Sequence, residues 1–218
     1  IKYNPPSLRN RLLLLLNKCW KAGSIPEDWK EAITLPIFKR GDKNNCNNYR
    51  GISLLNSCYK LYAKILGNRV KSIMETLLLE AQHGSRKGRS CSDCIFNIVK
   101  LLEKRKECNL PLYIAFIDYV KAFNKVKRNK LWEMMKDRGF PSHLIRAIQS
   151  LYAGTRIKIK SGVNQSNTTF EINLGVRQGC PLSPALFNLY IDDVIRQWQT
   201  ILLHNFKIGN QNLDTLLF

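Results

Sequence analysis

A single carboxylate at the end of an apolar run is the first residue of this chain that could do chemistry. Asp118 follows four apolar residues, 114–117, which is the pattern of a strand buried on both faces in the middle of a sheet. An aspartate that emerges there could bind a magnesium ion, because Mg²⁺ prefers oxygen ligands. It could equally cap the helix that follows, and the pattern alone favours the cap.

A turn framed by glycines and prolines is the second candidate. It lies in residues 175–188, where Gly175 and Gly179 permit backbone conformations or close approaches that a side chain would block. Pro184 stands where the first position of a helix is expected, and its missing N–H costs nothing there. We therefore expect a turn that presents its backbone and the amide of Gln178, followed by an apolar helix.

The charge of the chain limits the classes of partner. The 218 residues contain 35 Lys and Arg against 16 Asp and Glu, which gives a net charge of +19. Such an excess indicates a polyanionic partner, either nucleic acid or a membrane surface. The five leucines at 12–16 are too few to span a bilayer and are flanked by cations. We expect an intracellular, soluble protein that faces nucleic acid, with a hydrophobic content of 44% that suffices for a core.

Seven cysteines are an odd number in a chain for which we expect no secretory signal, so most should be reduced and structural. Cys91 and Cys94 have the C-x-x-C spacing of zinc or redox sites. No second such pair exists, and the three histidines are far apart in sequence. A structural role at the start of a helix is therefore favoured.

Hydrophobic periodicity predicts an α+β domain. Helices are expected over residues 7–21, 56–79, 90–106, 121–138, 141–153 and 183–203. Strands are expected over residues 32–38, 111–118, 156–161, 168–174 and from 213 onwards, with polar or basic loops at 39–48 and 82–90.

The stretch from Phe116 to Phe123 and the glycine-framed turn together resemble motifs A and B of reverse transcriptases, most closely those of LINE-type (non-LTR) retrotransposons. The resemblance implies that Asp118 is catalytic and binds metal, with the backbone carbonyl of Tyr119 as a second metal ligand. It implies that the ring of Phe123 packs under the deoxyribose and excludes a 2′-hydroxyl. The reaction would be transfer of dNMP to a primer 3′-hydroxyl with two Mg²⁺ ions.

The segments 35–42 and 48–56 resemble the basic strand and loop over the incoming nucleotide in the same family. By that resemblance Lys39 and Arg50 contact the triphosphate, since Lys offers a point charge and Arg a bidentate contact. Gln178 and Gly179 would line the pocket near the incoming nucleotide and the template base.

Two further basic segments are predicted to bind nucleic acid. The loop 82–90 resembles a template-contacting segment of the family, and its cations suit backbone phosphates: Arg86, Lys87 and Arg89. Arg156, Lys158 and Lys160 alternate along a predicted strand and so share one face. A charge run is usually a solvated surface, but several runs together with the net charge favour nucleic acid.

The tetrapeptide 190–193, Tyr-Ile-Asp-Asp, looks like the catalytic motif C of reverse transcriptases, but it lies inside the helix that starts at 183. We therefore expect Asp192 and Asp193 on or beside the polar face of that helix, opposite an apolar face formed by Phe187, Ile191, Val194 and Trp198. In LINE-type relatives the catalytic pair follows a short apolar strand, so we expect this chain to stop one residue before it and to be inactive alone.

The resemblance implies one reverse transcriptase domain with the fingers and partial palm of a right-hand polymerase: residues 1–110 and 111–218, an antiparallel sheet packed on helices, and no thumb. The partners would be an RNA template, a DNA primer and dNTP, without a membrane, and the location nuclear. Relatives usually have an acidic residue where Asn124 stands. The alternatives are a non-catalytic RNA-binding remnant and a basic protein of membrane surfaces, which residues 9–21 fit loosely.

Overall fold

The structure is a computed structural model that describes residues 5–162, 164–166, 168–201, 207–208 and 211–212. Its helices and strands, in chain order, are α1 (Pro6–Ala22), β1 (Glu31–Phe38), β2 (Tyr49–Leu54), α2 (Ser57–Met74), α3 (Cys91–Glu107), α4 (Arg128–Asp137), α5 (Ser142–Tyr152), β3 (Arg156–Ser161), β4 (Asn164–Gln165), β5 (Phe170–Glu171), α6 (Ser183–Ile201), β6 (Lys207–Ile208) and β7 (Gln211–Asn212). Short 3₁₀ turns lie at Glu27–Trp29, Cys46–Asn48 and Ala122–Lys125.

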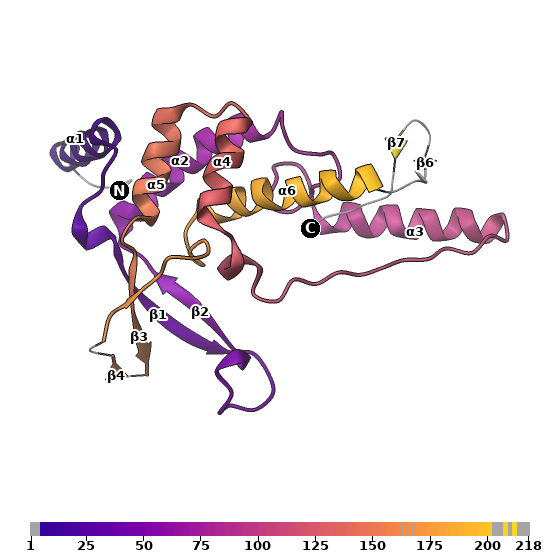
Figure 1. Ribbon diagram of the computed structural model, residues 1–218, viewed down its shortest axis with the longest axis horizontal. Coiled ribbons are helices and arrows are strands. Elements are labelled where there is room, and N and C mark those ends of the chain that lie inside the picture. The colour runs from indigo at the N-terminus through magenta and orange to yellow at the C-terminus, as the bar shows by residue number, and fades with distance from the viewer. Residues whose placement is uncertain (1–4, 163, 167, 202–206, 209–210, 213–218) are drawn as a thin grey trace.

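The sheet is mixed, which corrects the expectation of an antiparallel one. Its strand order is β2-β1-β3-β4, and β5 also pairs with β3. The pair β1–β2 is an antiparallel hairpin, whereas β1 and β3 run parallel from Glu31↔Arg156 to Thr34↔Ile159. A parallel pair needs a long crossover connection, and helices α2 to α5 provide it (Figure 1). The expected mixture of helices and strands is confirmed.

The core lies between the helices and draws on both halves of the chain. Helix α2 packs on α5 and α6, and α4 packs on the same two helices. The fully buried side chains of this core come from residues before and after position 110, among them Tyr59, Leu66, Met135, Ile148 and Leu186. Gly67 of α2 packs against the residue before α6, since a Cβ at Gly67 would lie in ordinary contact, 3.6 Å from the Cα of Leu182.

Helix α1 confirms the predicted helix at 7–21. It ends at Gly23, whose φ of 64° and N–H to the Cys19 carbonyl oxygen form a left-handed C-cap. Leu16 and Cys19 are buried, while Leu13 and Leu14 are exposed. Within the described part of the chain, no helix combines the length and the apolar character that crossing a membrane requires.

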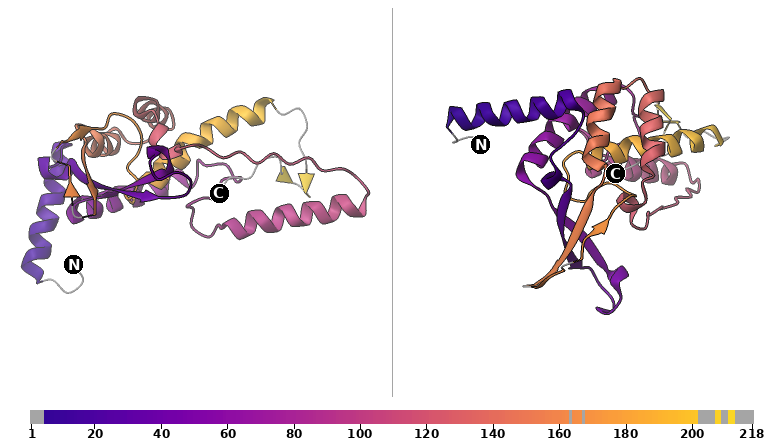
Figure 2. Two further views of the ribbon diagram at one scale, coloured as in Figure 1. Left: turned by 90° about the horizontal axis from the view of Figure 1, so that it is seen from below. Right: turned by 60° about the vertical axis from the view of Figure 1, so that its left-hand side comes forward.

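Helix α3 projects from the rest of the molecule (Figures 1 and 2). Its start is set by a capping box, in which Asp93 N–H donates to the Ser90 hydroxyl and Ser90 N–H donates to the Asp93 carboxylate. Only Cys94 and Leu101 of this helix are buried, and Cys91 is exposed. One face therefore leaves apolar side chains in solvent: Ile95, Phe96, Val99 and Leu102.

The strand predicted at 111–118 is wrong. These residues form an extended segment that pairs with no strand in the described part of the chain. Tyr113 is 91% exposed and Phe116 is 79% exposed, whereas a central strand would bury both. A strand needs neighbours for its N–H and C=O groups, and the sheet of β1 to β5 does not reach this segment. The further strand predicted from 213 onwards lies outside the described residues.

Two helix boundaries also differ from expectation. The helix predicted from 121 begins at Arg128, because Lys121 has a left-handed φ of 54° and residues 122–125 form a 3₁₀ turn. Helix α2 ends at Met74 rather than 79, and the segment that follows is bonded to other elements instead. The hairpin predicted from 156 to 174 forms, but its second strand is only Phe170–Glu171 instead of 168–174, with Arg156↔Glu171 and Ile157↔Phe170 as its pairs.

Candidate functional site

The glycine turn, residues 175–180, is bonded directly to the segment 121–126. Gly175 N–H donates to the Val126 carbonyl oxygen at 2.9 Å, and Val176 N–H donates to the Phe123 carbonyl oxygen at 2.8 Å. Gly175 has a φ of 81°, and a Cβ there would lie 2.7 Å from the Asn124 carbonyl oxygen. The two segments that resemble motifs A and B therefore touch along their backbones, and only glycine fits at this contact.

The same turn is bonded to strand β2 on its other side. Ser53 N–H donates to the Gln178 carbonyl oxygen at 2.9 Å. Gly179 has a φ of 105°, and a Cβ there would lie 2.7 Å from the Ser53 carbonyl oxygen. The turn thus joins the β1–β2 hairpin to residues 121–126, and it brings Phe123, Gln178 and Gly179 close together; their contacts with a nucleotide stay a prediction.

The ring of Phe123 lies against Phe187 of α6, with centroids 4.9 Å apart and an interplanar angle of 14°. Phe123 is half-buried and packs against the hydrophobic core. Its expected position under a sugar stays a prediction, and the stacking on Phe187 fixes where the ring is held.

Two arginines that sequence reasoning missed, Arg128 and Arg177, fix the glycine turn to neighbouring backbone segments. Arg128 Nε donates to the Gly175 carbonyl oxygen at 2.9 Å, and its Nη1 donates to the Tyr152 carbonyl oxygen at 2.9 Å. Burial lowers the pKa of Arg128. Arg177 Nη2 donates to the Lys30 carbonyl oxygen at 2.6 Å, and its guanidinium lies 5.1 Å from the Tyr59 ring centroid. The sequence did offer a signal for Arg177, because a charged residue next to Val176 in a turn that packs against the core needs partners inside the protein.

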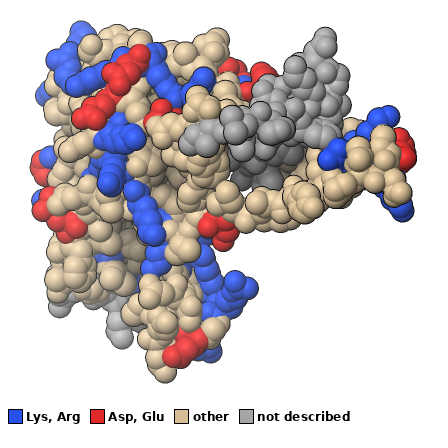
Figure 3. Space-filling view, turned by 45° about the vertical axis from the view of Figure 1, so that its right-hand side comes forward, with Lys and Arg blue, Asp and Glu red and all other residues tan. Residues whose placement is uncertain are grey.

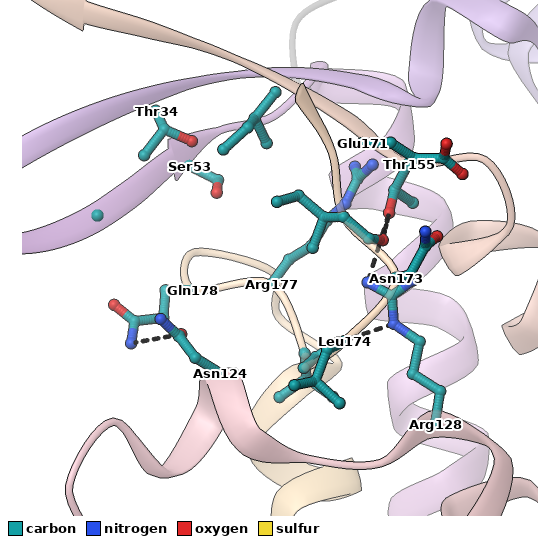
Figure 4. A pocket seen from close by; sticks show the side chains of 15 residues that line it. Thr34, Ser53, Asn124, Arg128, Thr155, Glu171, Asn173, Leu174, Arg177 and Gln178 are labelled. Carbon is teal, nitrogen blue, oxygen red and sulfur yellow. Dashed lines mark hydrogen bonds between the residues drawn. The ribbon is translucent and has the colours of Figure 1, made fainter. Parts of the chain in front are cut away.

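A cavity of about 410 Å³ opens beside the turn, between the sheet and residues 171–178 (Figure 4). Strands β1 and β2 contribute Thr34, Gly51 and Ser53 to its lining, and Asn124 and Gln178 line it from the other side. Two side-chain atoms of these residues, Thr34 Oγ1 and Gln178 Oε1, are buried without a hydrogen-bond partner in the described part of the structure. The cavity therefore combines an apolar wall with unsatisfied polar atoms, as ligand sites do.

Lys39 and Arg50 lie on the β1–β2 hairpin. Arg50 pairs with Ile37 across the hairpin, Lys39 N–H donates to the Asn48 carbonyl oxygen at 2.9 Å, and both side chains are exposed. Neither lines the cavity, although Gly51 beside Arg50 does. Lys121 Nζ donates to Asn47 Oδ1 at 2.7 Å, so the end of the hairpin lies next to the motif A segment.

Arg86 is a structural residue, and we withdraw it from the predicted template surface. Its side chain is 2% exposed and its Nη2 lies 2.7 Å from Glu75 Oε1. The same guanidinium donates to the carbonyl oxygens of Leu79 and Gln82 at 2.8 and 3.0 Å. These bonds hold the loop 75–90 in shape, and they leave the guanidinium unavailable to a phosphate.

The other two cations of this loop are accessible. Lys87 is exposed, and Arg89 is half-buried with its guanidinium bonded to the Glu80 carboxylate and carbonyl oxygen. The Arg89 guanidinium lowers the pKa of Glu80. Asn188 of α6 supports the loop by donating to the Gly84 carbonyl oxygen at 2.5 Å. Lys87 is therefore the predicted template contact that the structure leaves most open.

The cations of β3 face acidic residues of neighbouring elements. Lys158 Nζ lies 2.9 Å from Glu31 Oε1, and Arg156 Nη2 lies 3.6 Å from Glu27 Oε2. Lys160 is half-buried. Such exposed pairs are weak, so they do not remove these side chains from a nucleic acid, and their predicted contact with it remains untested.

The surface in Figure 3 shows how the positive charge is distributed. Lys and Arg side chains form a band along this face, with Asp and Glu in small groups beside it. The band accords with the net charge of +19. Cations that recur along one face can contact successive phosphates of a nucleic-acid strand.

Asp118 and Tyr119 are both exposed on the extended segment. Among the residues that the structure describes, no three His, Cys, Asp or Glu side chains gather into a group that could hold a metal ion. The described residues therefore do not form a two-metal centre around Asp118, and its role as a metal ligand stays a prediction.

The expected place of Asp192 on the polar face of α6 is wrong. Asp192 is fully buried, and its carboxylate accepts hydrogen bonds from Leu79 N–H, Arg138 and Arg196. The face of α6 that enters the core is formed by Ala185, Leu186, Leu189 and Ile195, while Val194 and Trp198 are only half-buried. The pair 192–193 does lie inside a helix, as expected.

Comparison with known proteins identifies the family. The family model described as "Reverse transcriptase (RNA-dependent DNA polymerase)" matches residues 39–211. An uncharacterized 149 kDa protein of transposon TX1 from Xenopus laevis is 31% identical over 179 residues, which cover 82% of this chain and 14% of that protein. The Pol polyprotein of retrotransposable element R2 from Popillia japonica is 26% identical over 200 residues, or 90% of this chain and 27% of that protein.

A probable RNA-directed DNA polymerase from transposon BS of Drosophila melanogaster is 28% identical over 190 residues, or 84% of this chain and 20% of that protein. The chain thus spans between 14% and 27% of the lengths of these three relatives. Because the family model matches residues 39–211, which are most of the chain, the chain belongs to the reverse transcriptase (RNA-dependent DNA polymerase) family.

Proposed function

We propose that this chain supplies the fingers, residues 1–110, and part of the palm, residues 111–218, of an RNA-directed DNA polymerase of a non-LTR retroelement that works in the nucleus. It grips an RNA template, a DNA primer and a dNTP. The observation that carries this proposal is the glycine turn, which bonds at once to the motif A segment through Phe123 and to β2 through Ser53. A nucleotide beside this turn touches both regions.

In the proposed reaction the primer 3′-hydroxyl oxygen attacks the α-phosphorus of the dNTP, the bond to the β-phosphate oxygen breaks, and pyrophosphate leaves. Lys39 and Arg50, exposed on the hairpin, neutralise the triphosphate. Phe123, held by its stacking on Phe187, packs under the sugar. Gln178 and Gly179 border the base, beside the cavity.

Divalent metal is typical of the family, and Mg²⁺ is our proposal for this chain. When bound, such ions stabilise the attacking and leaving oxygens of the displacement. Asp118 and the carbonyl of Tyr119 would be their ligands, but one carboxylate cannot hold two ions. Among the described residues, no three metal-binding side chains lie together.

A binding experiment tests the proposal. The 218-residue chain is titrated into a fluorescein-labelled DNA primer annealed to an RNA template with a 5′ overhang, and anisotropy is followed at several salt concentrations. We expect the affinity to fall steeply with salt, because phosphate contacts release counterions. Lys136 is an exposed lysine of α4 that is not among the residues proposed to contact nucleic acid, so the Lys136→Ala variant should bind like the unmutated chain. Absence of binding at low salt would contradict the proposal.

The exposed position of Asp118 favours a second candidate, a non-catalytic RNA-binding remnant. Both candidates predict binding, and they differ in what Asp118 does. Primer extension is therefore measured with a chain to which motif C has been restored. For a polymerase, such a chain extends the primer and Asp118→Ala abolishes extension; for a remnant, it does not extend the primer, and Asp118→Ala leaves its RNA affinity unchanged.

A further inference from the structure

Two arginines line the cavity beside the glycine turn, and neither is paired with an acid. Arg177 is buried and Arg128 is half-buried, and both belong to the lining. Arg86, by contrast, is buried in an ion pair with Glu75. A buried charge without an opposite charge is costly. The two arginines of the cavity therefore gain from any negative charge that enters it.

Arg128 is bonded to uncharged groups of the protein. Its Nε donates to the Gly175 carbonyl oxygen and its Nη1 to the Tyr152 carbonyl oxygen. Its Nη2 donates to Thr155 Oγ1 at 3.4 Å. A guanidinium carries five N–H groups, and these bonds use three of them. Arg128 can therefore donate to a ligand as well, without giving up its contacts with the described residues.

Arg177 is placed in the same way. It donates to the carbonyl oxygens of Trp29 and Lys30, at 3.4 and 2.6 Å. Its charge also acts on Arg128: burial is the main cause that lowers the pKa of Arg128, and the charge of Arg177 lowers it further. The two guanidinium groups thus repel each other, and an anion in the cavity would reduce that repulsion.

The cavity has the size and the opening that a ligand needs. Its volume is about 410 Å³, which lies within the usual range of ligand sites. Asn124, Asn173 and Leu174 line it and are exposed, so they form its mouth (Figure 4). On the wall formed by the sheet, Thr34 Oγ1 is buried without a partner among the described residues. Ser53 adds a second hydroxyl, and both hydroxyls can donate to an anion.

The acid in the lining does not neutralise the two arginines. Glu171 is exposed on strand β5, and none of the ion pairs in the described structure joins it to Arg128 or Arg177. Two positive charges against one negative charge leave the lining positive. Arginine binds phosphate oxygens with paired N–H donors, so an anion of the phosphate type suits this lining.

We propose that the cavity lined by Arg128 and Arg177 is a binding site for a phosphate group. The group is either a phosphodiester of a nucleic-acid strand that crosses the mouth, or a free phosphate or pyrophosphate ion. Lys39 and Arg50, to which we assign the triphosphate of the dNTP, do not line this cavity. The site is therefore a second phosphate site, beyond the proposed function, and its occupation needs no polymerisation.

Thermal unfolding tests the site with inorganic phosphate as the probe. The 218-residue chain is unfolded in sodium phosphate and in sodium chloride at equal pH and ionic strength. We expect Tm to rise with phosphate concentration, because a ligand that binds only the folded state stabilises it. The double variant Lys39→Ala/Arg50→Ala should keep this response. Equal Tm values in the two salts, or loss of the response in the double variant, would overturn the proposal.

A charge variant at the mouth locates the bound anion. Asn173→Asp adds a negative charge to the lining, whereas Asn68→Asp adds the same charge at an exposed position of α2 outside it. We expect Asn173→Asp to raise the Kd for phosphate about tenfold and Asn68→Asp less than about twofold, because repulsion falls with distance and is screened by salt. Equal effects of the two variants would refute a site in the cavity.

Arg128→Gln removes one of the two charges and should raise the same Kd by at least about tenfold. Because Arg128 also bonds the glycine turn, circular dichroism without phosphate establishes whether this variant folds. An unchanged Kd in a folded Arg128→Gln would contradict the proposal, and Asn173→Asp decides the question if the variant does not fold.

Competition in the double variant Lys39→Ala/Arg50→Ala identifies the source of the phosphate group. ³¹P NMR follows the line of inorganic phosphate, which broadens on binding, while single-stranded RNA or pyrophosphate is added. A line that RNA narrows supports a strand phosphate, and one that only pyrophosphate narrows supports a free ion. A line that neither narrows would argue against the site. If primer–template failed to bind while phosphate still raised Tm, the proposed function would fail and the phosphate site would stand.

Discussion

Asp192 in α6 accepts a hydrogen bond from Arg138 at the end of α4, with Oδ2 and Nη1 2.9 Å apart. The second carboxylate oxygen accepts from Leu79 N–H, also at 2.9 Å. One buried carboxylate thus joins α6, α4 and the segment after α2. The tetrapeptide 190–193, whose sequence looks like the catalytic motif C, therefore contributes Asp192 to a structural ion pair.

We predict that Asp192→Asn destabilises the protein by about 3–5 kcal/mol, because it removes the charge of a fully buried carboxylate that is paired with Arg138, which is only 15% exposed, and with Arg196. Urea denaturation followed by circular dichroism measures the change. Asp193→Asn is the control: Asp193 is partly exposed and lies 3.8 Å from Lys130, so its loss should cost less than about 1 kcal/mol. Equal effects of the two variants would contradict the structural role of Asp192.

Substitutions of Arg86 and of its neighbour Lys87 should have different effects, the first on stability and the second on RNA binding. Arg86→Ala removes the partner of Glu75 and of two carbonyl oxygens, so we expect a loss of about 3 kcal/mol in the free energy of unfolding. Lys87→Ala should leave stability unchanged and reduce the salt dependence of RNA binding by about one phosphate contact. Unfolding and anisotropy titrations of both variants check this, and a stable Arg86→Ala would show that the loop needs no such anchor.

The backbone contact at Gly179 predicts a strong effect of one methyl group. In Gly179→Ala the Cβ would meet the Ser53 carbonyl oxygen at 2.7 Å, at a φ of 105°. We expect a loss of about 2–4 kcal/mol, from backbone strain and from displacement of the turn, together with weaker binding of primer–template. Gly139→Ala is the control, since Gly139 has a φ of 75° but nothing within 4 Å of the added Cβ. Its smaller loss should reflect the backbone alone.

Because of Tyr62, the free energy of unfolding should decrease at alkaline pH. Burial raises the pKa of Tyr62 from 10.0 to about 12. Between these values the unfolded chain ionises this phenol while the folded protein does not, so the free energy of unfolding falls as pH rises, by up to about 2.7 kcal/mol. Below pH 10 that contribution is fully present.

Tyr62→Phe should remove this part of the pH dependence. At neutral pH the variant should be as stable as the unmutated chain or more stable, since the Tyr62 hydroxyl has no hydrogen-bond partner in the described structure. Urea denaturation at pH 7 and pH 11 measures both effects. Tyr113→Phe, at a side chain 91% exposed, should change neither. A destabilised Tyr62→Phe at pH 7 would show that the hydroxyl is satisfied in solution.

The elements that were predicted correctly carry local signals. Ser90 and Asp93 have the three-residue spacing of a capping box, which indicates the start of α3. The sequence Gly139-Phe140-Pro141 indicates the break between α4 and α5. The parallel pairing of β1 with β3 has no such signal. It depends on which strands meet after the helices have packed, and an isolated strand pattern does not contain that information.

The site was predictable to a similar degree. Phe123, Gln178 and Gly179 lie together because backbone geometry at two glycines enforces it, and glycines are visible in a sequence. Burial of a charge is not visible in the same way. Arg86 and Asp192 looked like surface residues, and only the tertiary structure shows the partners that hold them inside.

The parallel strand pair also sets an order for folding during synthesis. The edge of β1 that receives β3 stays without its partner until Ile159 has been made, since Thr34 pairs with Ile159. At roughly 5–20 residues per second, the ribosome needs on the order of ten seconds or more to reach that point. During that interval the nascent β1–β2 hairpin exposes an unpaired strand edge, which can pair with another chain and so lead to aggregation.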